Sequence, residues 1–391
     1  MKAEVIEKGL HSCKVKIEGS VTSNTSAELD GFLHSVIKDS APEQIELDFE
    51  GVDYISSTGL RVLLKLRKMG ISLLVTNTSA EVYEIFDITG FTAMFEVRRK
   101  LRELDVSNCE VIGCGANGIV YRIDQETILK LYTKSNDIEE VRSEQQHARY
   151  AIQVGVPTAI PFDVVKVGNR YGSVFELIDA KSIASIMGEN LDQALGYVKP
   201  YVDLLKSVHS IPYKKDNDSI LTDAAAKFKG YVQDIEKSRL YDQLFPSLWK
   251  FADGIPESNT ILHGDCQPGN VMVTDDELLF IDMDTLSFGN PLYDLGYLYS
   301  TMITYNKIPT MKNVVHIPVE SSLEYWTQMF EVYYEDRTEE ERESLKAMCK
   351  IISYTQVLRY MIRHPERSLT ELNQTICDRL IGLLAGNSNF N

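Results

Sequence analysis

Apolar positions along the first hundred residues repeat with two alternating periods. Apolar and polar residues alternate over 14–21, as in a half-buried strand, and apolar residues then recur at helical spacing over 26–38. The same pair of patterns returns twice, with strands expected over 44–49 and 71–77 and helices over 58–69 and from Ser79 onward. Because strands and helices alternate in this way, the pattern predicts a small α/β domain over 1–104.

The pattern changes at Glu110. Residues 119–123 alternate and are rich in β-branched and aromatic side chains, and a short polar turn separates them from a second expected strand over 127–132. Helical spacing follows over 137–153, and residues 301–391 are mostly helical by pattern and poor in glycine. We therefore expect a second domain that begins with a hairpin and a helix and ends in helices.

Charge and composition narrow the class of protein. The 391 residues carry a formal net charge of −17, most of it beyond residue 104. Such an acidic chain repels polyanions, so we expect no nucleic acid and no membrane as partners, and a neutral or cationic partner fits better. No run approaches the roughly 18–20 apolar residues that span a bilayer, and no signal peptide is evident. The six cysteines form no C-x-x-C pair, which indicates reduced thiols in a cytoplasmic protein.

Three glycines directly precede the first expected strand, and because a strand follows them they are expected to lie in a hairpin. They give the spacing G-x-G-x-x-G-x-V, formed by Gly113, Gly115, Gly118 and Val120. A dinucleotide-binding loop with such glycines would open a helix, whereas here a strand follows. Kinases cover the phosphates of the nucleotide with a glycine-rich hairpin and place a lysine on the next strand. Lys130 occupies the centre of that strand, and Glu144 in the following helix is the expected partner that positions it.

A second motif, ILHGDCQPGNVMV (261–273), has the spacing of a kinase catalytic loop. His263, Asp265 and Asn270 form H-x-D-x-x-x-x-N, and Asp282 follows at the end of another expected strand. Mg²⁺ ions that bridge phosphate oxygens need oxygen ligands, which Asn270 and Asp282 supply. Asp265 is then expected to orient the acceptor hydroxyl and to accept its proton.

The segment DFEGVDYISSTGLRVLLKL (48–66), with the order of elements around it, resembles the STAS family, the domain of anti-sigma-factor antagonists and of sulfate-transporter tails. In regulatory members a serine before the central helix is phosphorylated by a partner kinase, and the matching residue here is Ser57. Those members usually carry aspartate just before the acceptor, whereas this chain has Ser56. Two interpretations stay open: Ser57 is a phosphorylation site, or Ser56 to Thr58 only cap the helix.

H-G-D at the catalytic loop, I-D-x-x-x after it and the distal Y-D-L-G resemble the aminoglycoside phosphotransferase and choline kinase superfamily over about 105–300. The resemblance implies a two-lobed, protein-kinase-like α+β domain, with an N-lobe over 105–180 and a mainly helical C-lobe over 181–391. It also implies ATP and Mg²⁺ as cofactors. Because glycine rather than arginine precedes Asp265, regulation through activation-loop phosphorylation is not expected.

The same resemblance implies roles for further residues. The backbones of Glu176 and Ile178 would bind adenine. Asp284 would assist the metal, and Asp294 would brace the catalytic loop without reacting. His209 lies in an apolar helical stretch, so we expect it to be a packed residue rather than a ligand.

Together these features predict an ATP-dependent phosphotransferase that transfers the γ-phosphate to a hydroxyl of a small molecule. The negative charge of the second domain favours a cationic molecule. The STAS domain is then a regulatory or docking module for a protein partner. The alternative is a signalling protein in which the kinase domain phosphorylates Ser57. A nucleotide-sensing scaffold without chemistry is disfavoured, because all of the residues expected to react are present: Lys130, Asp265, Asn270 and Asp282.

Overall fold

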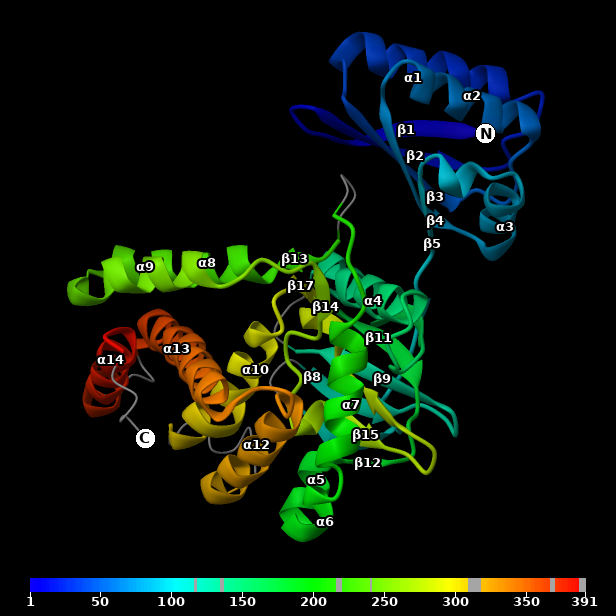
Figure 1. The fold of residues 1–391 in the computed structure, drawn as a ribbon. Helices are drawn as coiled ribbons and strands as arrows, with labels where there is room; N and C mark the ends of the chain where they lie inside the picture. The colour runs from blue at the N-terminus through cyan, green and yellow to red at the C-terminus, as the bar shows by residue number, and fades with distance from the viewer. Residues whose placement is uncertain are drawn as a thin grey trace. The chain divides into compact units, whose positions relative to one another are not determined.

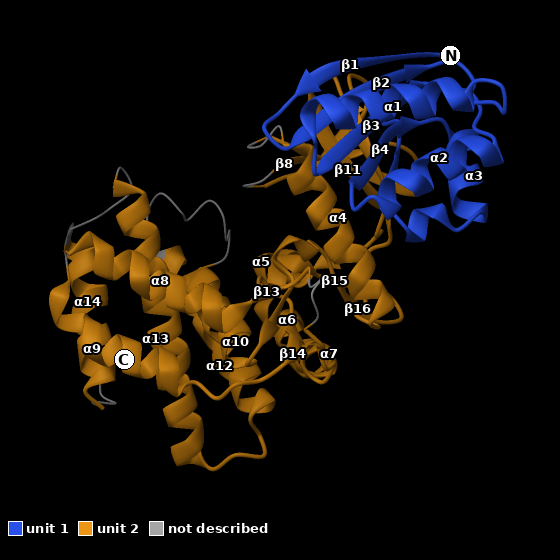
Figure 2. Cartoon of the chain, turned by 90° about the horizontal axis from the view of Figure 1, so that it is seen from above, with its two compact units in different colours: residues 1–103 blue, residues 104–391 orange. Residues whose placement is uncertain are grey.

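The chain divides into two compact units, Met1–Glu103 and Leu104–Asn391 (Figure 2). The computed structural model describes residues 1–115, 118–133, 137–215, 220–239, 241–308, 318–365 and 370–386. Each unit has a hydrophobic core of its own. Among the described segments, no helix combines the length and the apolar character that crossing a bilayer requires.

The first unit is a five-stranded sheet with helices packed on it (Figure 1). Strand β1 runs antiparallel to β2, and the following neighbours pair in parallel in chain order. Inward side chains of the sheet, such as Val15 and Leu47, share a core with Leu33 and Leu63 of the helices. The elements are β1 (Lys2–Lys8), β2 (Ser12–Glu18), α1 (Ser26–Ser40), β3 (Gln44–Gly51), α2 (Ser57–Lys68), β4 (Ser72–Thr78), α3 (Ala80–Ile88), the 3₁₀ turn η1 (Phe91–Ala93) and β5 (Glu96–Arg99).

The strands and helices that the hydrophobic pattern predicts in this unit are all present, which confirms the α/β class. The edge strands β1 and β5 are additional. Burial alternates only over the first part of β1, where Ala3 and Val5 are half-buried, and the remaining side chains are exposed, so the apolar pattern is too short to predict the strand. An edge strand contributes its backbone to the sheet without needing a strong side-chain pattern.

The second unit begins with five strands of a six-stranded sheet in the order β6-β10-β11-β9-β8-β7, whose edge strand β6 (Arg102–Glu103) consists of the last two residues of the first unit. The other strands are β7 (Glu110–Cys114), β8 (Gly118–Arg122), β9 (Thr127–Tyr132), β10 (Pro161–Val167) and β11 (Arg170–Glu176). Helix α4 (Ile138–Gln153) packs against β10 and β11. The β8–β9 hairpin and α4 confirm the strands and the helix expected from 119 to 153.

The rest of the second unit is mainly helical and holds two small three-stranded sheets (Figure 1). The strands are β12 (Lys181–Ser182), β15 (Val271–Val273) and β16 (Leu278–Phe280) in one sheet, and β13 (Thr222–Asp223), β17 (Ser287–Gly289) and β14 (Thr260–Leu262) in the other. The helices are α5 (Ile183–Glu189), α6 (Leu191–Leu195), α7 (Val198–His209), α8 (Ala224–Ser238), α9 (Phe245–Gly254), α10 (Leu292–Tyr299), α12 (Val319–Tyr333), α13 (Glu339–Arg363) and α14 (Thr370–Leu384). Short 3₁₀ or π turns lie at η2 (Asp242–Leu244), η3 (Pro268–Asn270), η4 (Met283–Thr285), η5 (Ser300–Thr304) and η6 (Tyr305–Lys307). An α+β fold with a helical C-terminal region is therefore confirmed.

Candidate active site

Lys130 is the centre of a buried cluster of charges. It lies on β9, and its ammonium is 2.8 Å from Glu144 of α4 and 2.7 Å from Asp282, which follows β16. The Lys130 side chain is 13% exposed and that of Glu144 4%. The second oxygen of Glu144 accepts a hydrogen bond from the Tyr132 hydroxyl. The structure therefore brings together the lysine and the glutamate expected to be partners, and adds Asp282 to the pair.

The surrounding carboxylates keep Lys130 charged. Burial lowers the pKa of Lys130, but Asp282, Glu144 and Asp284 more than compensate, so its pKa lies above its ordinary value. Burial, with the negative charge of Asp282 second, raises the pKa of Asp284 to about 7. A permanently charged ammonium beside closely spaced carboxylates is suited to a ligand that carries both phosphate groups and a divalent cation.

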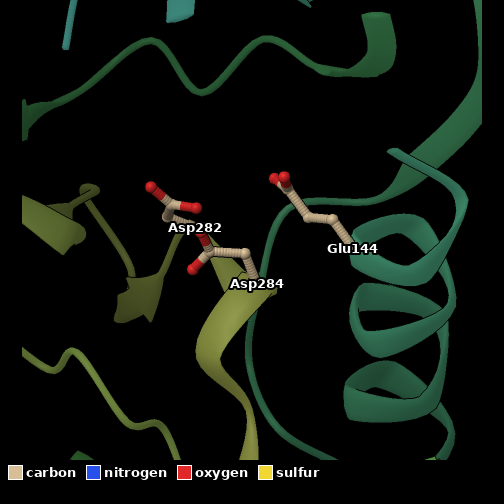
Figure 3. Close-up of side chains that lie close together, drawn as sticks. All are labelled: Glu144, Asp282 and Asp284. Atoms are coloured by element: carbon tan, nitrogen blue, oxygen red, sulfur yellow. The ribbon is translucent and has the colours of Figure 1, made fainter. Parts of the chain in front are cut away.

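Three carboxylates meet at one place (Figure 3). Single oxygens of Glu144, Asp282 and Asp284 all lie within 4.8 Å of one another, and their side chains point into the same space. Asp282 has a left-handed backbone (φ 66°) and directly precedes the 3₁₀ turn η4, which contains Asp284. Closely spaced carboxylate oxygens are the ligands that a hard cation prefers.

Asp265 lies in the loop between β14 and η3. Its Oδ2 accepts hydrogen bonds of 3.1 Å from Gln267 Nε2 and from Asn270 Nδ2. Burial, and after it the charge of Asp282, raises the pKa of Asp265 to about 6. The Asn270 amide nitrogen also donates to the Asp265 carbonyl at 2.9 Å, and the Asn270 backbone carbonyl accepts from Ile281 N–H at 2.9 Å. In the described residues the side-chain oxygen of Asn270 has no such partner and is available to a ligand.

Asp294 of α10 fixes the backbone of this loop. It is fully buried and accepts hydrogen bonds from the N–H groups of His263, at 2.9 Å, and Gly264, at 2.8 Å. The ring of His209 lies 3.0 Å from the same carboxylate. Burial alone would raise the pKa of Asp294, but these partners lower it below its ordinary value. The contacts confirm the bracing position expected for Asp294 and the packed position expected for His209.

Gly264, between His263 and Asp265, has a backbone that only glycine adopts easily. Its φ is +84°, and a Cβ at this position would collide with the carbonyl oxygen of Thr285. The Thr285 hydroxyl in turn donates to the carbonyl of His263 at 3.0 Å. The close approach of the two loops therefore requires glycine at the centre of the H-G-D sequence.

The glycine-rich segment is a hairpin turn. Strands β7 and β8 pair antiparallel, with Gly113 opposite Val120, and Gly115 N–H donates to the Gly118 carbonyl at 2.9 Å. A Cβ on Gly118 would collide with the backbone of Leu131 on β9. Ala116 and Asn117, at the tip, lie outside the described residues. The glycines therefore open a strand, as expected for a phosphate-covering hairpin rather than for a dinucleotide-binding helix.

The two residues expected to contact adenine are Glu176, the last residue of β11, and Ile178, which lies just after it. Glu176 N–H donates to the Ile160 carbonyl at 3.0 Å, and Leu177 N–H donates to the Glu126 carbonyl at 2.7 Å. The Ile178 carbonyl accepts from Ala180, while in the described part of the chain its N–H has no partner. Ile178 N–H is therefore a donor that a base could use.

Ser57 is the first residue of α2 and is exposed. The capping role belongs to Ser56, whose hydroxyl accepts from Gly59 N–H at 3.3 Å and lies 2.7 Å from the Thr58 hydroxyl. The Ser57 hydroxyl therefore lies at the positive end of the helix and does not serve as its N-cap.

Sequence reasoning missed two side chains that complete the site. Tyr132 was detectable in principle, because it lies two positions after Lys130 and so on the same face of β9. Gln267 lies two residues after Asp265 in a loop, where no periodic pattern indicates direction.

Both units match models of known protein families. The model of the phosphotransferase enzyme family (APH) matches residues 108–310, and the STAS domain model matches residues 2–104. A Bordetella bronchiseptica protein whose name describes it as an anti-sigma factor antagonist, BtrV, is 34% identical over 85 residues, which are 21% of this chain and 72% of that protein.

Solved structures with partial likeness include two kinases of small molecules. Aminoglycoside phosphotransferase APH(2'')-Ib with bound ADP is 14% identical, covering 80% of this chain and 100% of that one, with a TM-score of 0.48. A choline/ethanolamine kinase family protein from Mesorhizobium loti is 12% identical, covering 73% and 93%, with a TM-score of 0.47. Family membership rests on the sequence matches: the chain belongs to the phosphotransferase enzyme family and carries a STAS domain at its N-terminal end.

Proposed function

We propose that the protein is an Mg²⁺- and ATP-dependent phosphotransferase that transfers the γ-phosphate to a hydroxyl of a small molecule. The observation that carries this proposal is the contact of Lys130 with both Glu144 and Asp282. It joins the strand after the glycine-rich hairpin to the loop that holds the metal-ligating carboxylates. In kinases these two parts must meet for phosphoryl transfer.

Each part of the site has a role in this proposal. The hairpin of Gly113, Gly115, Gly118 and Val120 covers the phosphates, and Lys130, positioned by Glu144, neutralises their charge. Asn270, Asp282 and Asp284 would hold Mg²⁺, which would offset the negative charge of the phosphate oxygens. The backbones of Glu176 and Ile178 bind adenine.

The chemical step uses Asp265. The acceptor oxygen forms a bond to the γ-phosphorus, the bond from that phosphorus to the β–γ bridging oxygen breaks, and ADP leaves. Asp265 orients the hydroxyl and takes its proton. Catalysis then consists of positioning and charge neutralisation, as is usual for phosphoryl transfer.

The STAS domain is a regulatory or docking module for a protein partner in this proposal. A second candidate function is a partner switch in which the kinase domain phosphorylates Ser57. It is favoured by the exposure of Ser57 at a helix N-terminus while Ser56 supplies the cap. A phosphate there meets free N–H groups and the positive end of the helix.

ATP turnover by the purified protein, with a panel of small alcohols and amines and read together with intact mass, tests both candidates. ADP release that depends on Mg²⁺ and on an added alcohol supports the small-molecule kinase. Asp282→Asn should abolish this release and weaken Mg²⁺-dependent nucleotide binding. An increase in melting temperature with NAD(H) but not with ATP would refute the kinase interpretation of the glycines.

A further inference from the structure

Helices α8 and α13 and the turn η6 bring together charged and aromatic side chains that the roles above leave unused. We call them the α8/α13 cluster, defined as Lys227, Tyr231 and Asp234 on α8, Tyr305 on η6, and Arg359, Tyr360 and Arg363 on α13. The two helices pack against each other in the second unit, as Figure 1 shows.

Two guanidinium groups share one carboxylate in this cluster. Arg359 Nε lies 3.0 Å, and Arg363 Nη2 2.8 Å, from the same oxygen of Asp234. Lys227, two turns before Asp234 on the same face of α8, lies 5.5 Å from the ring centre of Tyr297, and no carboxylate in the described residues pairs with it. Three cations against one anion make this face positive, although the chain as a whole carries −17.

Arg359 has unused hydrogen-bond donors. Its Nε is engaged by Asp234, but in the part of the chain that the structure describes neither of its Nη nitrogens has a partner. Its guanidinium lies 4.5 Å from the ring centre of Tyr231, which fixes its plane. A planar guanidinium with free Nη groups matches the two oxygens of a carboxylate or a phosphate.

Aromatic rings line the cluster beside these cations. Tyr305 meets Tyr360 edge-on, with 5.4 Å between the ring centroids. Tyr231 and Tyr297 are 6.3 Å apart. Such rings can pack on the apolar body of a small molecule.

Helix α10 connects the cluster with the catalytic loop. Asp294 of α10 accepts hydrogen bonds from the N–H groups of His263 and Gly264 in that loop. Tyr297, about one turn later on the same helix, contacts Tyr231 and Lys227 of the cluster. One short helix therefore contacts both the catalytic loop and the cluster.

We propose that the α8/α13 cluster is the acceptor side of the active site and that the acceptor is an anionic hydroxy compound, whose carboxylate or phosphate group binds to Arg359 and Lys227. This inference rests on the proposed function. It replaces the cationic acceptor that the net charge suggests, because charge summed over a whole surface does not describe the charge at one site. Asp234 and Arg363 are positioning residues for Arg359.

Four compounds with one skeleton, PhCH₂CH(OH)–X, test the charge of the acceptor. X is a carboxylate in 3-phenyllactate, a phosphate ester in 3-phenyl-1,2-propanediol 1-phosphate, a neutral CH₂OH in the parent diol and an ammonium in 1-amino-3-phenyl-2-propanol. Binding to the full-length protein is followed by ligand-observed NMR, and transfer by ADP release with Mg-ATP. We expect an anion to bind more tightly than the diol and the amine. Which anion binds better identifies the group that Arg359 recognises.

Substitutions on α13 test whether Arg359 binds the anionic group of the acceptor. Arg359→Gln should raise the Kd and KM of the preferred anion at least about tenfold, the effect of losing a charge-assisted hydrogen bond. Arg359→Lys should restore part of the binding, which a folding defect would not allow. The matched control is Arg342→Gln on the same helix, whose Nε pairs with Glu331 at 2.8 Å and which should change neither constant.

The outcomes separate this inference from the proposed function. Anion binding that depends on Arg359, without ADP release, supports the cluster and refutes phosphotransfer. ADP release with the diol or the amine, but not with the anions, supports phosphotransfer and refutes an anionic acceptor. Equal binding of all four compounds, no binding, or binding that Arg359→Gln leaves unchanged also overturns the inference.

Discussion

The active site and the start of α2 are both suited to phosphate, yet they are built in opposite ways. At the active site, Lys130 and Asp282 are 152 residues apart in the chain and meet as buried charges. At α2, the groups are neighbours in sequence, and Ser56 and Thr58 are linked by uncharged hydroxyls while Ser57 is exposed. Converging buried charges can perform chemistry on a ligand, whereas an exposed helix start can only receive it. The comparison therefore distinguishes a site that is suited to catalysis from one that is suited to carry a phosphate group in the partner-switch proposal.

The largest effect is expected from Asp265→Asn. The amide cannot accept the proton of the acceptor hydroxyl, so transfer should fall about a thousandfold or more while the fold is kept. Steady-state ADP release measures the loss, and the melting temperature checks the fold. Asp276→Asn, which replaces an exposed carboxylate shortly after the catalytic loop, is the matched control and should be silent. Unreduced turnover in Asp265→Asn would contradict the role of Asp265 as the group that accepts the proton, and with it the assignment of this site as catalytic.

Lys130→Ala should cost at least about a hundredfold in rate, because one charge that faces phosphates in a water-poor cleft contributes several kcal/mol. Glu144→Ala should cost less, since Asp282 also contacts the lysine at 2.7 Å. The control is Lys181→Ala, which removes an exposed ammonium that pairs with Glu189. If Glu144→Ala were the more damaging change, Glu144 would have a role beyond holding Lys130, such as ligating the metal.

Asp294→Asn should destabilise the second unit by about 2–4 kcal/mol, because a buried carboxylate with three donors is replaced by an amide that also donates. The folded-state pKa of Asp294 is lowered, so its contribution is present above the unfolded pKa of about 4 and is lost as pH falls further. Chemical denaturation should therefore give a constant difference from wild type between about pH 7 and 5 and a smaller one below about pH 4. A difference that grows on acidification would contradict this assignment.

The smallest effects are expected at α2. Ser56→Ala should cost about 1 kcal/mol through loss of the cap, whereas Ser57→Ala should cost less than about 0.5 kcal/mol. Ser57→Asp should be tolerated, because the helix dipole favours a negative charge there. Intact mass after incubation with Mg-ATP then tests the partner switch. A single added phosphate that Ser57→Ala abolishes supports it, and its absence together with unchanged kinetics leaves the first unit as a docking module.

Local patterns predicted what is local in this molecule. The helix start at Ser57, the hairpin of β8 and β9, and the spacing from His263 to Asn270 all lie within short stretches, where period and spacing fix geometry. The contact of Lys130 with Asp282 could be expected only through the family resemblance, since no periodicity links residues so far apart. The pairing of Arg359 with Asp234 had no signal, because ordinary helix-surface charges look the same in sequence.

Gly264 bears on how such an enzyme can change its mode of control over evolutionary time. Kinases with arginine at the matching position can be regulated by phosphorylation of their own activation loop. Here a single mutation to arginine would drive a side chain into the Thr285 carbonyl, and the positive φ of +84° would add strain. As long as this loop and Thr285 keep their present paths, regulation through an arginine at position 264 is excluded by backbone geometry. Any control of this site would then act through other residues.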